Sequence, residues 1–168
     1  ATGRGGTYTL EQDTVSVDQY AFYSSRLTEI TLPQELEQIK KYSFSKVRIS
    51  TITIPNQVSS VGEAAFRQCS KLNAVVLGKA VTEIDKNAFQ ECSALETVSA
   101  QPDDALRSIS EFAFADCSQL KSVDSVDTGV ETIGQAAFLG CVSLERVTLP
   151  NTITSLGEYM FKWCDGLH

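Results

Sequence analysis

The stretch Ile133-Gly134-Gln135-Ala136-Ala137-Phe138-Leu139-Gly140-Cys141-Val142-Ser143-Leu144-Glu145-Arg146-Val147-Thr148-Leu149-Pro150 decides the fold, because the rest of the chain repeats its order of residue types. It starts with an aliphatic residue, passes through small residues to a phenylalanine and a cysteine, and ends in apolar-x-x-apolar-x-apolar. The final i, i+2 pair has the period of a strand with one buried face. The stretch therefore predicts a turn followed by a half-buried strand.

The same residue types recur every 22 to 25 residues along the chain. The recurring phenylalanines are Phe22, Phe44, Phe66, Phe89, Phe114, Phe138 and Phe161. An aliphatic residue stands five positions before each of them: Val17, Ile39, Val61, Ile84, Ile109, Ile133 and Leu156. The strand motif recurs as Leu27-Ile30-Leu32, Ile49-Ile52-Ile54, Leu72-Val75-Leu77, Leu95-Val98-Ala100, Leu120-Val123-Ser125 and Leu144-Val147-Leu149. Such a period indicates a solenoid, in which each repeat buries its apolar face against its neighbours.

We therefore predict an α/β, mostly β, solenoid of about seven repeats, with parallel strands on one face and short helical or 3₁₀ turns opposite. The segment between the glycine corner and the cysteine is too short for a stable isolated helix, so a single turn should hold each phenylalanine in the core. Residues 1–7 read as a flexible N-terminal segment, and residues 8–168 as one solenoid domain truncated at the C-terminus. Its uncovered ends favour end-to-end self-association.

The pattern Leu-x-x-Val-x-Leu-Pro-Asn-x-Ile-x-x-Leu-Gly-x-x-x-Phe, residues 144–161, resembles the BspA-like leucine-rich repeat. Residues 58–69 and 130–141 match its second half, and the resemblance extends from Tyr8 to Leu167. Two repeats depart from it by carrying Ser25 and Val47 in place of cysteine. The resemblance implies a leucine-rich-repeat solenoid of a bacterial protein, located outside the cell or on its surface. It also implies a role in adhesion and in binding host or matrix proteins.

The five cysteines come one per repeat, each three residues after the phenylalanine: Cys69, Cys92, Cys117, Cys141 and Cys164. Metal sites need closely spaced pairs such as Cys-x-x-Cys, which this sequence lacks. Neighbouring cysteines stand close enough for a disulfide in such a stack, but their number is odd and Val47 fills the same position. We expect buried thiols that pack as small apolar side chains.

The sequence offers little material for catalysis. His168 is the only histidine and stands at the terminus, which argues against a Ser-His-Asp or Cys-His arrangement. The acidic pair Asp103-Asp104 reads as a solvated loop. No phosphate-binding loop, metal motif or cofactor motif is present.

The net charge of −7 argues against nucleic acid as a partner, and no apolar run reaches the length of a membrane span.

The candidate binding residues are aromatic, hydroxyl-bearing or cationic: Tyr20, Tyr23, Tyr42, Thr31, Thr53 and Arg146. Tyrosine and arginine are enriched among the residues that dominate interfaces, whereas threonine on an exposed strand also follows from β propensity alone. Packing between repeats is the competing interpretation for the tyrosines. Trp163 reads as a cover for the C-terminal end.

Two hypotheses remain. The first is a non-catalytic interaction module that binds a protein or a glycan. The second is a structural spacer or assembly segment of a larger surface protein, with no ligand of its own. A contiguous exposed apolar patch of roughly several hundred Å² favours the first, and a uniformly polar surface with apolar exposure only at the two ends favours the second.

Overall fold

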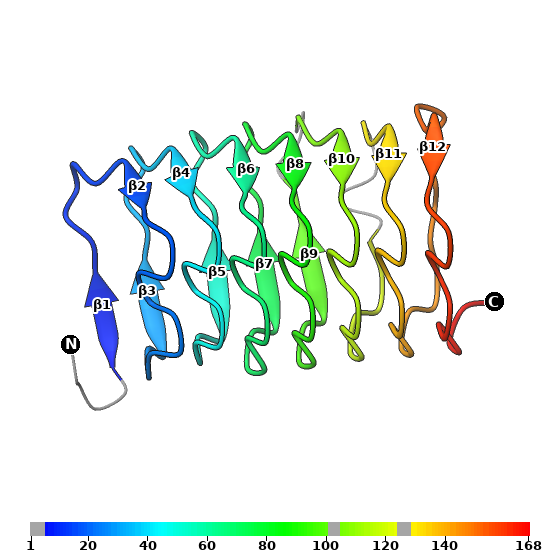
Figure 1. Cartoon of the computed structure of the whole chain (residues 1–168), viewed down its shortest axis with the longest axis horizontal. Coiled ribbons are helices and arrows are strands. Elements are labelled where there is room, and N and C mark those ends of the chain that lie inside the picture. Colours follow the sequence, from blue (N-terminus) through cyan, green and yellow to red (C-terminus); the bar gives the residue numbers. More distant parts are fainter. Residues whose placement is uncertain (1–5, 101–104, 124–128) are drawn as a thin grey trace.

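The computed structural model describes residues 6–100, 105–123 and 129–168, which form a stack of coils along one axis (Figure 1). Each coil contains a two-residue strand and a turn that carries the repeat phenylalanine, and coils 1 to 5 also contain a three-residue strand. We number the coils 1 to 7 by Phe22, Phe44, Phe66, Phe89, Phe114, Phe138 and Phe161. The predicted acidic loop, Ser125 and residues 1–5 lie outside the described residues.

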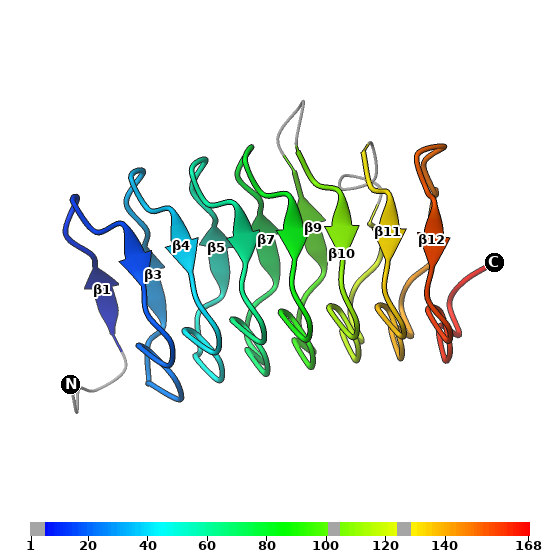
Figure 2. The same cartoon turned by 45° about the horizontal axis from the view of Figure 1, so that its top comes forward.

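The strands form two rows, one behind the other (Figure 2). The first row comprises β1 (Thr7–Thr9), β3 (Glu29–Thr31), β5 (Thr51–Thr53), β7 (Ala74–Val76) and β9 (Thr97–Ser99). The second comprises β2 (Ser16–Val17), β4 (Gln38–Ile39), β6 (Ser60–Val61), β8 (Glu83–Ile84), β10 (Ser108–Ile109), β11 (Thr132–Ile133) and β12 (Ser155–Leu156). All strand pairs are parallel. The parallel solenoid is confirmed, and the second row is an addition to the single strand face that we predicted.

Backbone pairing divides the first row but not the second. β1 pairs with β3, and β7 pairs with β5 on one side and β9 on the other, whereas β3 and β5 belong to different sheets. The second row is one seven-stranded sheet whose edges are β2 and β12. In coils 6 and 7, the first row continues only as an isolated bridge between Ser122 and Arg146. The molecule therefore presents one continuous sheet and one interrupted sheet.

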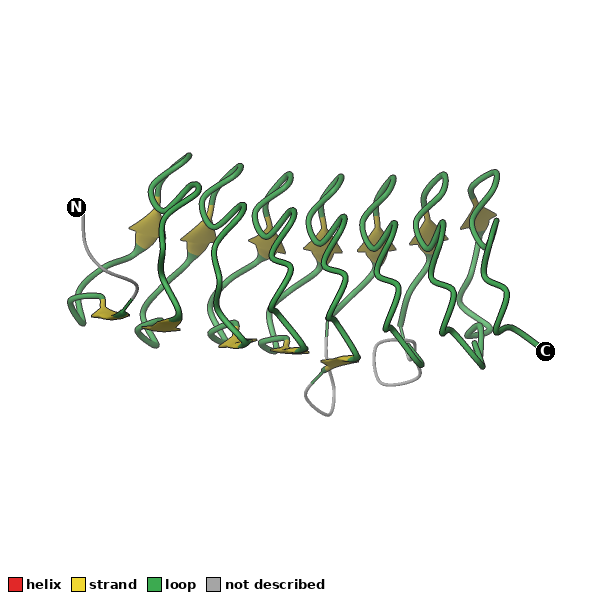
Figure 3. Cartoon of the chain, turned by 90° about the horizontal axis from the view of Figure 1, so that it is seen from below, coloured by secondary structure: helices red, strands yellow, loops and turns green. Residues whose placement is uncertain are grey.

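The turns are not helical, which corrects the predicted helical or 3₁₀ turn (Figure 3). In the described residues they are runs of three overlapping β-turns, such as those closed by Ala21 N–H to Asp18 O, Tyr23 N–H to Tyr20 O and Ser25 N–H to Phe22 O. The intervening N–H groups donate to the next coil; Phe22 N–H, for example, donates to Ser43 O at 2.8 Å. Because every second donor is used between coils, no helical ladder forms.

Each turn also places two residues at positive φ, two positions before and two positions after the phenylalanine. Both stand third in a turn, as the positive-φ residue of a type II turn does. In coil 6 the second position is Gly140, but elsewhere it is filled by non-glycine residues such as Gln68 (φ 59°). These conformations are therefore a property of the repeat.

The core is a column of stacked phenylalanine rings. Phe44, Phe66, Phe89, Phe114 and Phe138 are buried, and their neighbouring ring centroids lie 5.2–5.5 Å apart. Phe22 and Phe161, at the two ends, are only partly buried. Burying one such side chain contributes about 1.5–3 kcal/mol, so the column is a principal source of stability.

The cysteines are free and buried, as expected, but they also donate hydrogen bonds. Each Sγ donates to the phenylalanine carbonyl of the preceding coil, from Cys69 Sγ to Phe44 O at 3.1 Å through to Cys164 Sγ to Phe138 O at 3.1 Å. The thiols thus link successive coils.

Glycine at the corner before the turn allows close stacking of the coils. A Cβ atom at Gly134 would lie 2.6 Å from Glu111 N, closer than packing permits.

Among the described residues, no helix is long and apolar enough to cross a membrane.

Candidate functional site

Three tyrosines meet on the turns of coils 1 and 2. The rings of Tyr20 and Tyr42 are stacked, with centroids 5.2 Å apart, and Tyr23 meets Tyr20 edge to face at 5.6 Å. Tyr20 and Tyr23 remain 48% and 42% exposed. The structure therefore brings together three of the six predicted binding residues.

Two lysines border these rings. Lys41 Nζ lies 5.3 Å from the Tyr42 ring centroid, and Lys46 Nζ lies 5.5 Å from that of Tyr23. Lys41 also forms an ion pair with Glu63 at 2.8 Å, and this hydrogen bond raises the pKa of its ammonium group. We call Tyr20, Tyr23, Tyr42, Lys41 and Lys46 the tyrosine surface. It offers apolar ring area and positive charge side by side.

The backbone makes this arrangement costly. Tyr20 and Tyr42 have φ values of 60° and 55°, a region that costs a non-glycine residue about 1–2 kcal/mol. Other coils fill the same position with smaller residues such as Ala64 and Asn87. The position therefore does not require an aromatic ring, and stacking accounts for only part of the surface because the rings of Tyr20 and Tyr23 remain exposed.

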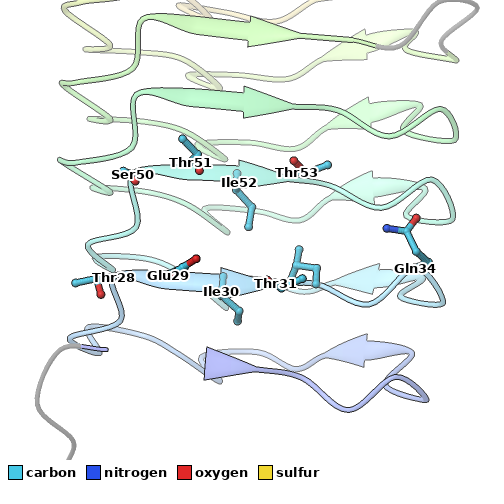
Figure 4. Close-up of a pocket in the computed structure, with 10 residues that line it drawn as sticks. Thr28, Glu29, Ile30, Thr31, Gln34, Ser50, Thr51, Ile52 and Thr53 are labelled. Carbon is cyan, nitrogen blue, oxygen red and sulfur yellow. The ribbon is translucent and has the colours of Figure 1, made fainter. Parts of the chain in front are cut away.

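Thr31 and Thr53 lie elsewhere, on β3 and β5. They border a shallow groove of about 430 Å³ at the interruption of the first row of strands (Figure 4). Its other polar side chains are Thr28, Glu29, Gln34, Ser50 and Thr51. Ile30 and Ile52 also border the groove, but both are buried. The groove offers hydroxyl groups and one carboxylate at the surface, with little apolar area.

Arg146 joins neither of these groups. It lies in coil 7, opposite the end that carries the tyrosines, and is bridged to Ser122. Trp163, which we expected to cover the C-terminal end, is 60% exposed. Lys162 Nζ lies over the rings of Trp163 and Tyr159, 4.7 and 5.2 Å from their centroids.

One carboxylate has a perturbed pKa that sequence reasoning missed. Burial raises the pKa of Asp85 to about 6, and the nearby Glu83 and Glu63 add to the shift. Asp85 occupies the corner position at which Gly62 and Gly134 stand in other coils. A carboxylate at a position that other coils fill with glycine is the feature of the sequence that could have identified it.

No group of three or more metal-ligating side chains is positioned to hold a metal ion in the described part of the chain.

Exposed apolar side chains concentrate at the ends of the stack. In the described ranges, eight of the nine exposed large hydrophobic residues belong to coils 1 and 7. They are Tyr8, Val15, Tyr20 and Tyr23 in coil 1 and Leu149, Leu156, Tyr159 and Trp163 in coil 7. The ninth is Val142. The sides of the intervening coils are largely polar.

Comparison with known proteins places these features in a family. The family described as BspA type leucine rich repeat region matches residues 6–104 and 101–168, with six copies of the repeat. No curated protein matches the chain.

Three solved structures have the same fold. A leucine-rich repeat protein from Eubacterium ventriosum superposes with a TM-score of 0.87 and 25% identity, over 98% of this chain and 43% of that one. One from Bacteroides ovatus gives 0.72 and 24%, over 95% and 47%. The leucine rich repeat protein of T. pallidum gives 0.68 and 31%, over 76% and 59%. The chain spans about half the length of these proteins.

Proposed function

Because the chain belongs to the BspA type leucine-rich repeat family, we propose that it is a non-catalytic interaction module of a bacterial cell-surface or secreted protein. Its ligand is a host or matrix protein or a glycan. The observation that carries this proposal is the tyrosine surface, where exposed aromatic rings and lysines converge on two adjacent coils.

The composition of this surface is that of a binding site. Interfaces concentrate their binding energy in tyrosine, tryptophan and arginine side chains, and tyrosine combines an apolar ring with a hydroxyl group that can remain hydrated. The stack fixes the ring of Tyr20 against Tyr42 before any ligand arrives, so binding needs less ordering of side chains.

The groove at Thr31 and Thr53 is a second candidate surface of the same module. Its hydroxyl groups suit hydrogen bonding to a polar ligand such as a glycan, but it has no exposed aromatic ring. Arg146 lies too far along the stack to act with either group, and we assign it no role in this site.

A structural spacer or assembly segment is the alternative function. It is supported by the confinement of eight of the nine exposed large hydrophobic residues, among those described, to the end coils. A spacer needs apolar contacts only where it joins other parts of an assembly.

The test is a binding screen of the 168-residue chain against extracellular-matrix proteins and glycans. We expect Tyr20→Ala/Tyr42→Ala to weaken binding about 30-fold, corresponding to about 2 kcal/mol for the loss of dominant contacts. Phe112→Ala is the matched control, because Phe112 occupies the same position in coil 5 with a φ of 55°. It should bind as the wild type does.

Equal binding by the double variant would remove the tyrosine surface from the proposal. Failure of the wild type to bind any member of the screen would favour the spacer.

A further inference from the structure

We propose that the edge between the turns of coils 1 to 3 and the strands that follow them binds a sulfated polysaccharide. Arg26, Arg48 and Lys71 line this edge, and we call these three cations the basic column. The inference rests on the proposed function, because it names a ligand class for the same module. The basic column lies between the tyrosine surface and the groove at Thr31 and Thr53.

The repeat directs the side chains of the basic column away from the core. Each of them stands directly before the first apolar residue of the strand motif, which is Leu27, Ile49 or Leu72. Those three apolar residues are buried, whereas the three cations are exposed. The basic column therefore lies on the side of the stack.

Stacking of the coils does not cover this side. The segment that carries Arg48 is hydrogen-bonded to the segments before and after it in the stack. The bonds run from Arg48 N–H to Leu27 O at 2.9 Å and from Asn73 N–H to Ser50 O at 2.8 Å. Arg48 is nevertheless exposed, so the repeats themselves leave this surface free.

The three cations repeat at a regular interval. At the turns that precede them, the ring centroids of Phe22, Phe44 and Phe66 lie 5.2 Å apart from one coil to the next. The basic column thus presents one positive charge per coil along the stack. A linear polymer with anionic groups along its length can contact all three cations at once and release its own counterions.

The charges of the basic column are not used within the part of the chain that the structure describes. Six other cations form ion pairs there, but Arg26, Arg48 and Lys71 form none. Glu29, the acidic residue closest to the column in the sequence, accepts a hydrogen bond from Thr7 at 2.9 Å. Free guanidinium and ammonium groups can donate charge-assisted hydrogen bonds to the oxygens of a sulfate group.

The basic column ends where the charge of this edge changes. After the turns of coils 4 to 6, the equivalent positions hold Ala94, Gln119 and Ser143. The same edge there carries Glu96, which is paired with Lys121 at 2.7 Å. The net charge of −7 opposes a polyanion at long range, so the binding energy has to come from the edge of coils 1 to 3.

The segment after the turn of coil 2 connects the basic column to both surfaces described above. Lys46, Arg48 and Ser50 are exposed and alternate with Val47 and Ile49, which are buried. Lys46 belongs to the tyrosine surface, and Ser50 borders the groove (Figure 4). The hydroxyl groups of the groove can exchange hydrogen bonds with those of sugars. A polymer of sugars that carries sulfate groups therefore fits both features, whereas an acidic peptide fits only the charges.

Heparin, a sulfated polysaccharide, is the probe for a binding test of the 168-residue chain by isothermal titration calorimetry. We expect its dissociation constant to rise roughly 20- to 40-fold between 50 and 200 mM salt, because three cations displace the counterions of a linear polyanion. Fully desulfated heparin should bind about tenfold more weakly, since it cannot accept the charge-assisted hydrogen bonds. Polyglutamate should also bind more weakly than heparin.

The variant Arg48→Gln/Lys71→Gln removes two of the three cations. It should bind heparin about tenfold more weakly at 50 mM salt. Its dissociation constant should rise only about threefold over the same salt range, because one cation remains. The matched control is Arg146→Gln/Lys79→Gln, which removes the same two charges from exposed positions outside the column. The control should bind as the wild type does, and circular dichroism checks that both variants are folded.

Equal losses of affinity in the two double variants would overturn the proposal, because net charge and not the basic column would then govern binding. Equal affinities for heparin and desulfated heparin, or for heparin and polyglutamate, would overturn it as well. A wild type that binds a matrix protein or an uncharged glycan but not heparin would overturn this inference and leave the proposed function intact. A wild type that binds no protein or glycan at all would overturn both.

Discussion

Removing one ring from the middle of the phenylalanine column should cost far more stability than removing one from its end. Phe89 is fully buried and stacks on Phe66 and Phe114, each at 5.3 Å between centroids. Replacing a buried phenylalanine by alanine costs about 3–5 kcal/mol, because it removes apolar contacts and leaves a cavity. Phe161 is partly buried and stacks on one neighbour only, at 5.8 Å. Its replacement should cost about half as much.

Urea unfolding followed by circular dichroism measures this difference. With a denaturant slope of about 2 kcal/mol/M, Phe89→Ala should lower the midpoint by about 2 M and Phe161→Ala by about 1 M. Phe112→Ala serves as the control, because its side chain lies outside the column and the positive φ is retained. Its midpoint should change least.

Equal losses for Phe89→Ala and Phe161→Ala would refute this reasoning, since the stability would then not depend on the number of stacked neighbours. A loss below about 1 kcal/mol for Phe89→Ala would do the same, because it falls outside the range for a filled core position.

Two further predictions concern titratable groups. Because burial raises the folded-state pKa of Asp85 from 3.8 to about 6, the stabilising effect of its protonated form is complete below pH 4 and is lost as the pH rises through 6. Between pH 4 and pH 8, the free energy of unfolding of Asp85→Asn should therefore rise by about 1–2 kcal/mol relative to that of the wild type, after allowance for the partial exposure of Asp85. Urea unfolding at both pH values measures this difference. A fall relative to the wild type would contradict the assignment. Burial also raises the pKa of the Cys92 and Cys117 thiols, so alkylation followed by mass spectrometry should label them only after unfolding, and rapid labelling of the native chain would refute their burial.

The repeat phenylalanines, the cysteines and the aliphatic residues could be assigned to the core from spacing alone. A pattern such as Leu144-x-x-Val147-x-Leu149 determines which side chains share a face, because consecutive strand residues point to opposite sides. Seven repetitions leave only one arrangement in which every repeat buries its apolar side. The tyrosines could also be selected as candidates, since tyrosine is enriched among the residues that dominate interfaces.

The turns, the second row of strands and the grouping of the candidate residues were decided by the tertiary structure. The sequence does not show that Phe22 N–H donates to Ser43 O in the next coil, and this use of alternate donors replaces the expected helical turn. Nor does it show that Tyr20 stacks on Tyr42 while Thr31 and Thr53 border a separate groove. The physical reason is that local patterns determine which side chains are buried. For alternate backbone donors of the turns and for the Tyr20 ring, a partner is instead supplied by the next coil, 21 or more residues away, and its identity depends on how the coils stack.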